Sequence, residues 1–223
     1  MDERFERNIG AITEEEQELL KTKKAAVIGC GGLGCYIAEF LTRMGLKSLT
    51  LIDGDVFAAS NINRQLNSMG INLGMNKALE TRRVLLMVRP DLTVRAVDSF
   101  LTGENAEELL KDHDIIMDAL DNIKTRLLVE KTANALGIPL VHGAVKEWSA
   151  QVCTVFPGDL TLSILYKAKD EYEKQSVLSF TPALCASLQA AEAVKVLLNK
   201  ENTLRKKLLT GDLSKGSFEI IDL

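Results

Sequence analysis

The stretch VIGCGGLGCYIAEFL, residues 27–41, limits the possible folds of this chain more than any other segment. It has the pattern of a strand, a glycine-rich turn and the start of a helix. Gly29, Gly31 and Gly34 match the G-x-G-x-x-G turn of dinucleotide-binding proteins, and Gly32 is an extra glycine within it. Because backbone amides at a helix N-terminus attract phosphate, the stretch predicts a nucleotide site. The glycines alone leave open whether NAD or another nucleotide binds.

Strand and helix patterns alternate along the first 145 residues, and the expected strands are apolar throughout. The strands are expected at 24–29, 48–53, 93–100, 114–120 and 139–145. The helices between them are expected at 33–45, 76–89, 105–113 and 124–137. Strands that are apolar on both faces belong to a parallel sheet covered on both sides. The pattern predicts a doubly wound, Rossmann-like α/β fold with its site at the carboxyl ends of the strands.

The last third of the chain has a different pattern. Residues 149–156, 208–211 and 217–223 predict short, antiparallel strands that extend the mostly parallel sheet. Residues 182–200 predict a long, buried helix. The polar stretch 157–180, rich in Lys and Glu, predicts a mobile crossover loop.

The composition is typical of a single soluble domain, which we expect to span residues 1–223 with a helical arm at 1–22. Thr13 and Glu16 in that arm predict a capping box. A net charge of −4 argues against non-specific nucleic-acid binding, which needs a basic surface. No apolar run reaches membrane-spanning length and no signal-peptide pattern is present, so we expect a cytoplasmic protein.

The four cysteines, Cys30, Cys35, Cys153 and Cys185, form no C-x-x-C pair, so we expect no zinc site. We expect reduced and mostly buried thiols, with Cys30 partly accessible in the glycine loop.

Polar residues after the second strand indicate which nucleotide binds. Asp53 ends that strand, 19 residues after Gly34, where a carboxylate binds ribose hydroxyls. Asp55 is either a second polar contact or an ordinary loop acid. The segment that follows contributes a set of amides and cations: Asn61, Asn63, Arg64, Gln65 and Lys77. A triphosphate needs such cations, whereas a glycine loop and a helix N-terminus suffice for the pyrophosphate of NAD, so the set favours ATP.

A third polar group, Asp118, Asp121 and Asn122, lies in the sequence MDALDN at the end of a buried strand. Mg²⁺ binds through one or two carboxylates together with phosphate oxygens. Asp121 is the expected Mg²⁺ ligand because it lies past the strand end. Asp118 is alternatively a helix cap or the partner of a nearby cation.

Seven elements in this order resemble the ThiF/MoeB/HesA family, relatives of the adenylation domain of ubiquitin-activating enzymes: RFERN, GCGGLG, LIDGD, SNINRQ, Lys77, DALDN and SLQAAEAVK. The resemblance covers most of the chain. It implies an adenylyltransferase that uses ATP and Mg²⁺ to activate a ubiquitin-like sulfur-carrier protein of the ThiS/MoaD type. The carboxylate activated would be that of the carrier's C-terminal Gly-Gly, in thiamine or molybdopterin biosynthesis.

The resemblance also implies roles for individual residues. Gly31 and its neighbours hold phosphate, and Asp53 holds the ribose. The other implied roles are phosphate binding and transition-state stabilisation by Arg64 and Lys77, Mg²⁺ binding by Asp121, and lining of the phosphate region by Asn61 and Gln65. Arg7 of RFERN resembles an arginine that reaches into the site of a partner subunit, which implies a homodimer.

The chain departs from many family members in lacking two C-x-x-C pairs and in having no cysteine between Pro157 and Thr181. We therefore expect adenylation by this chain and sulfur delivery by another protein. Three alternatives remain open. One is a related enzyme that adenylates another carboxylate or a carbamoylated tRNA base. Another is an NAD-binding oxidoreductase, for which His142 is the one catalytic candidate. The third is a non-catalytic partner-binding member, which predicts loss of the phosphate cations or of the Mg²⁺ acid.

Overall fold

One mixed β-sheet forms the centre of the molecule. The computed structural model describes residues 2–167 and 176–223, and within them the sheet has eight strands in the order β3-β2-β1-β4-β5-β6-β7-β8. The parallel strands are β1 (Lys24–Ile28), β2 (Ser48–Ile52), β3 (Thr93–Val97), β4 (Ile115–Asp118) and β5 (Leu140–Lys146). The antiparallel strands are β6 (Ser149–Val155), β7 (Lys207–Asp212) and β8 (Ser217–Asp222). The predicted doubly wound sheet with an antiparallel extension is confirmed.

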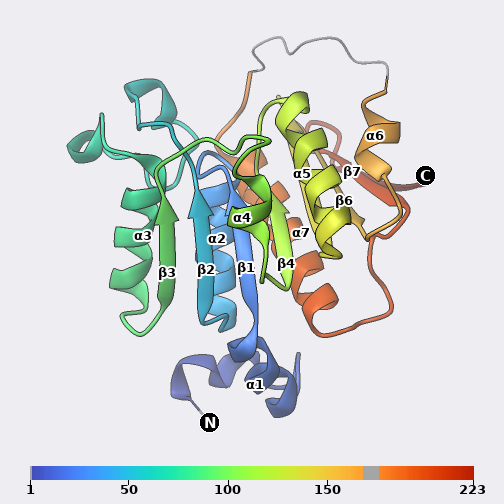
Figure 1. Ribbon diagram of the computed structural model, residues 1–223, viewed down its shortest axis with the longest axis horizontal. Coiled ribbons are helices and arrows are strands. Elements are labelled where there is room, and N and C mark those ends of the chain that lie inside the picture. Colours follow the sequence, from blue (N-terminus) through green and yellow to red (C-terminus); the bar gives the residue numbers. More distant parts are fainter. Residues whose placement is uncertain (1, 168–175) are drawn as a thin grey trace.

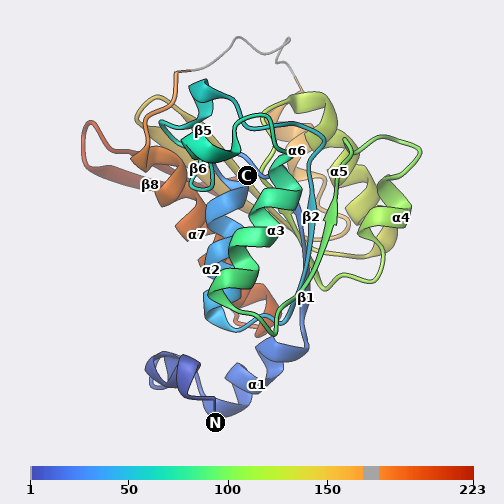
Figure 2. The same cartoon turned by 90° about the vertical axis from the view of Figure 1, so that its left-hand side faces the viewer.

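Helices cover both faces of this sheet (Figures 1 and 2). One face packs against α2 (Gly34–Met44), α3 (Lys77–Val88) and α7 (Phe180–Leu197). The other packs against α4 (Ala106–Leu110), α5 (Ile123–Leu136) and α6 (Thr161–Leu165). Alternation along β1 divides its side chains between the two cores, with Ala25 and Val27 in one and Ala26 and Ile28 in the other.

Helix ends follow the local rules that the sequence indicated. The capping box of Thr13 and Glu16 begins α1 (Glu14–Thr22). Helix α2 ends at Gly45, whose φ of 106° is left-handed. The side chain of Asn76 caps the amide of Leu79 and so begins α3 with Lys77 as its first residue.

The N-terminal arm and the connections between strands and helices contain further short helices. The 3-10 helix η1 (Glu3–Asn8) and α1 lie beyond the amino ends of the parallel strands (Figure 1). The other 3-10 helices, η2 (Ala59–Asn61) and η3 (Gly70–Asn72), lie in the connection between β2 and α3. Of the expected crossover loop, residues 161–165 form α6, and residues 168–175 lie outside the described part of the chain. No helix in the described ranges is both long and apolar enough to cross a membrane.

Candidate functional site

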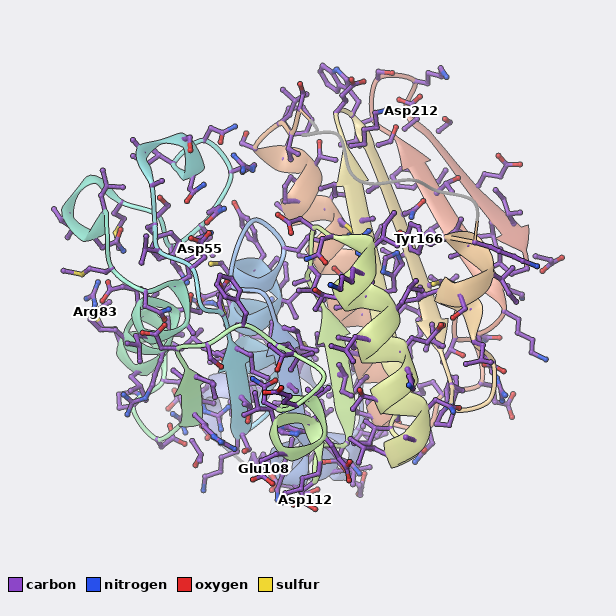
Figure 3. The ribbon with its side chains drawn as sticks, turned by 45° about the horizontal axis from the view of Figure 1, so that its top comes forward. Asp55, Arg83, Glu108, Asp112, Tyr166 and Asp212 are labelled. Carbon is purple, nitrogen blue, oxygen red and sulfur yellow. The ribbon has the colours of Figure 1, made fainter. Side chains whose placement is uncertain are left out.

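A cavity of about 420 Å³ opens at the carboxyl ends of the parallel strands. Strand order reverses between β1 and β4, and a crevice at such a switch point is the usual ligand site of doubly wound sheets. The predicted site residues that line it are Gly29, Gly31, Gly32, Asp53, Asp55, Arg64, Gln65, Lys77, Asp121 and Asn122. In Figure 3, which brings this end of the molecule forward, Asp55 lies toward α3 and Tyr166 toward α6.

The four glycines of the turn divide into two pairs. A Cβ on Gly29, where φ is 90°, would lie 2.7 Å from the carbonyl oxygen of Ala119. A Cβ on Gly34 would lie 1.8 Å from the carbonyl oxygen of Gly29, so helix α2 packs directly on the turn. On Gly31 and Gly32 an added Cβ meets its nearest atoms at 3.5 Å, an ordinary contact. The first pair is required by the fold, and the second leaves space open at the cavity.

Helix α2 points its N-terminus at this space. Its N-cap, Leu33, provides no side-chain hydrogen bond to the first turn. The first amides of a helix carry partial positive charge and lack partners within the helix. The helix start behind Gly31 and Gly32 therefore suits an anion.

Asp53 connects the end of β2 to the glycine turn. Its Oδ2 accepts from the amide of Cys30 at 2.7 Å, and its Oδ1 accepts from the amide of Asp55 at 2.8 Å. Burial raises the pKa of Asp53, although both amide hydrogen bonds oppose the shift. The carboxylate is thus fixed beside the cavity, and its oxygens retain acceptor capacity for a ligand's hydroxyl groups.

Lys77 and Asp55 form an ion pair at the start of α3. The Lys77 side chain is only 8% exposed, whereas that of Asp55 is 55% exposed. Although burial acts to raise the pKa of Asp55, the hydrogen bond from Lys77 lowers it overall. Asp55 therefore holds the Lys77 ammonium group at the cavity wall, in addition to lining the cavity itself.

Arg64 and Gln65 lie on the loop after β2. Arg64 Nη1 donates to the carbonyl oxygen of Ser60 at 2.9 Å and to Asn63 Oδ1 at 2.8 Å. Gln65 is buried, and its Oε1 has no hydrogen-bond partner in the described part of the chain. Asn61 does not line the cavity; its Oδ1 accepts from the amide of Ala58 at 2.9 Å and shapes the turn.

Asp118, the last residue of β4, and Asp121, which follows the strand, have different environments. Asp118 is fully buried, and its Oδ2 lies 2.6 Å from His142 Nδ1. Asp121 is exposed at the cavity, so it is the carboxylate accessible to a metal ion. Asn122 lines the cavity but also caps α5, because its Oδ1 accepts from the amide of Thr125 at 2.8 Å.

Two further side chains in the cavity lining, those of Arg126 and Phe100, are candidates for ligand contact that the sequence motifs do not identify. Arg126 follows Asn122 by one helical turn, and this i, i+4 spacing on α5 places it near the same edge. Phe100 follows β3 and is 66% exposed at the cavity. Its position after a parallel strand was the available signal.

Arg7 belongs to η1, the segment beyond the opposite ends of the parallel strands (Figure 2). It does not line the cavity of its own chain. The four cysteines are buried free thiols. The expected accessibility of Cys30 is wrong, because the turn folds its side chain inward, and burial raises its pKa. Within residues 2–167 and 176–223, no group of three or more His, Cys, Asp or Glu side chains is placed to hold a metal ion.

Comparison with known proteins gives consistent matches. The ThiF family profile matches residues 5–223. The SAMP-activating enzyme E1 of Haloferax volcanii is 30% identical over 227 residues, covering 98% of this chain and 84% of that protein. The sulfur carrier protein adenylyltransferase of Thermus thermophilus is 34% identical over 219 residues, covering 93% and 81%. The crystal structure of E. coli MccB with ATP shares the fold, with a TM-score of 0.86 at 18% identity, covering 100% of this chain and 71% of that one.

Proposed function

This chain belongs to the ThiF family, and we propose that it is an adenylyltransferase that uses ATP to activate a ubiquitin-like sulfur-carrier protein. The observation that carries the proposal is the meeting of Arg64, Lys77 and Asp121 around the space beside the glycine turn. An enzyme that transfers hydride to NAD does not need these two cations and this carboxylate. A non-catalytic member would not be expected to retain them.

The residues present fit ATP and Mg²⁺. The start of α2 and the open space at Gly31 and Gly32 suit phosphates. The unpaired Oε1 of Gln65 suits a donor group of the nucleotide. Asp53 would accept from the ribose hydroxyls, and the exposed ring of Phe100 offers a surface for the adenine.

In the proposed reaction, the carrier's C-terminal carboxylate oxygen attacks the α-phosphorus of ATP. A bond forms between that oxygen and phosphorus, the bond to the β-phosphate oxygen breaks, and pyrophosphate leaves with the electron pair. The carboxylate is already ionised at neutral pH, so no general base is needed. Arg64 and Lys77 would offset the repulsion between the two anions and stabilise charge on the leaving group. Mg²⁺ held by Asp121 would neutralise phosphate charge when bound.

We also infer a homodimer in which the partner subunit's Arg7 completes the site. Large apolar side chains are exposed along residues 56–87, on the loop beside the cavity and on α3: Val56, Ile62, Leu66, Ile71, Leu73, Met75, Leu79 and Met87. An extensive exposed apolar surface favours contact with another protein. A second copy on this surface could bring its η1 to the cavity that its own chain does not reach. In this role the protein would work in the cytoplasm.

ATP–pyrophosphate exchange with a carrier ending in Gly-Gly tests the function. Arg64→Ala and Asp121→Asn should each lower exchange by at least ~10²-fold, as loss of other transition-state contacts does. Arg83→Ala and Glu108→Gln are matched controls, since both side chains are charged and lie outside the cavity (Figure 3). The absence of exchange with any such carrier, together with tight NAD binding, would contradict the proposal.

A further inference from the structure

A buried polar network lies directly beside the candidate site. It joins Asp118 of β4, His142 of β5, Arg126 of α5 and Tyr166, which follows α6, and each of these residues is at most 6% exposed. His142 Nδ1 lies 2.6 Å from Asp118 Oδ2, and His142 Nε2 lies 3.0 Å from the Tyr166 hydroxyl. Arg126 Nη1 donates to the same hydroxyl at 3.0 Å. His142, the catalytic candidate of the oxidoreductase alternative, is therefore a member of this buried network.

The chemistry of the four side chains assigns the donor and the acceptor of each hydrogen bond in the network. Although burial acts to raise the pKa of Asp118, its hydrogen bond with His142 and the nearby Arg126 charge lower it overall. Burial lowers the pKa of His142, so its ring is neutral and donates Nδ1–H to the Asp118 carboxylate. Tyr166 then donates its O–H to His142 Nε2 and accepts from Arg126. The Tyr166 hydroxyl also accepts from Gln151 Nε2 at 3.1 Å, whereas Arg126 Nε has no hydrogen-bond partner in the described part of the chain.

The network fixes the backbone on which the site residues lie. Asp118 Oδ1 accepts from the amide of Leu120 at 2.9 Å. Arg126 Nη2 donates to the carbonyl oxygen of Leu120 at 2.6 Å. Leu120 is thus held at both its amide and its carbonyl group, and Asp121 is the next residue. These two contacts fix the backbone from which the Asp121 side chain extends.

Contacts with Glu130 of α5 and with this network hold the segment that enters the crossover. Glu130 of α5 accepts from the amides of Leu162 and Ser163 at 2.5 and 2.9 Å, which holds the start of α6. Tyr166 holds the other end of this helix against Arg126 and His142. Residues 161–167 are consequently anchored to the helix that begins at the cavity.

We propose that Tyr166 and His142 are positioning residues for adenylation, because they hold Arg126 and Asp118 in the arrangement that fixes Leu120 and therefore Asp121. The role rests on the proposed function. It makes the segment at 161–167 part of the adenylation machinery, although none of the side chains of this segment lines the cavity.

The Mg²⁺ dependence of ATP binding tests this role in the intact chain. Tyr166→Phe removes one hydroxyl and keeps the ring, so Arg126 loses a partner and Asp121 loses its fixed position. We expect the Mg²⁺ concentration for half-maximal ATP binding to rise about 10-fold, and kcat for exchange to fall about 10-fold, as small displacements of catalytic groups do. Tyr36→Phe on α2 removes the same atom outside the cavity and should change neither value.

Variants of His142 separate positioning from packing. His142→Gln can still donate to Asp118 and accept from Tyr166, so it should restore most of the Mg²⁺ dependence that His142→Leu loses. Thermal unfolding of each variant identifies loss of the fold. If the wild type binds Mg·ATP and Tyr166→Phe binds it with the same Mg²⁺ dependence, the positioning role is overturned and the proposed function stands. If the wild type binds no Mg·ATP, both are overturned.

Discussion

Substitution of single glycines in the turn should separate its structural from its ligand-binding positions. Gly31→Ala adds a methyl group that meets Gln65 Nε2 at 3.5 Å, and the φ of Gly31 lies outside the left-handed region. Alanine therefore fits without strain, and by restricting the unfolded chain it should leave stability unchanged or raise it by up to ~1 kcal/mol. The methyl group occupies the space expected for phosphate, so the KM for ATP should rise by about 10- to 100-fold.

Gly34→Ala should have the opposite profile. Its Cβ would lie 1.8 Å from the carbonyl oxygen of Gly29, whereas real Cβ contacts essentially never fall below 3.0 Å. Helix α2 must therefore move by at least the difference, about 1.2 Å. That helix packs on the sheet beside α3 and α7 and cannot move freely. We expect a loss of at least ~3 kcal/mol. For a chain of this size, this lowers Tm by about 6–12 °C.

Thermal unfolding and calorimetric titration with Mg·ATP measure both effects on the same samples. Gly32→Ala is the matched variant, because its Cβ also meets its nearest atoms, in Pro182, at 3.5 Å. A Gly31→Ala protein that binds ATP like the wild type would refute the assignment of this turn to phosphate. A Gly34→Ala protein with wild-type Tm would refute the packing argument.

Three further predictions concern the proposed dimer, the buried His142 and Gln65. Arg7→Ala and Arg64→Ala chains should each be inactive. Mixing them should restore about a quarter of wild-type exchange, because half of randomly formed dimers are mixed and each mixed dimer has one intact site of two. The absence of recovery after subunit exchange would contradict sharing of the site. Because the pKa of His142 is lowered in the fold, the unfolded chain binds its proton first, and the free energy of unfolding should fall as pH drops from 7 to 5.5. Urea unfolding should show a smaller fall in stability over this pH range for His142→Gln than for the wild type. An equal fall in both proteins would argue against His142 as its source. Gln65→Met should change stability by less than ~1 kcal/mol while weakening ATP binding in calorimetry, and unchanged affinity would count against a nucleotide contact.

Local patterns were sufficient to predict most of the fold. Continuous apolar strands, the Thr13 capping box and the glycine at position 45 each act within a few residues, so their outcomes follow from the sequence nearby. The placement of Asp53 and Asp121 at one edge followed from the rule that parallel strands end together.

Other features depend on partners that are distant in the sequence. Helix α6 lies in a stretch whose composition predicts a loop. The helix forms because Glu130, 32 residues before Leu162, accepts hydrogen bonds from its first amides. Cys30 is buried by the way the turn folds over the sheet, which composition does not indicate. The contacts of His142 likewise require the sheet register, which brings it opposite Asp118.

The charges at the cavity also bear on why a second subunit would be needed. Three carboxylates and three cations line it: Asp53, Asp55, Asp121, Arg64, Lys77 and Arg126. Two of these cations already face carboxylates of this chain, since Lys77 pairs with Asp55 and Arg126 Nε lies 3.7 Å from Asp118 Oδ2. ATP with one Mg²⁺ remains anionic, and the carrier's carboxylate adds a further negative charge at the point of attack. One protomer's cavity therefore supplies little positive charge beyond Arg64 to offset both anions. The partner subunit's Arg7 would supply the missing cation, which is why restored exchange in the mixed dimer is the sharpest test of the proposed site.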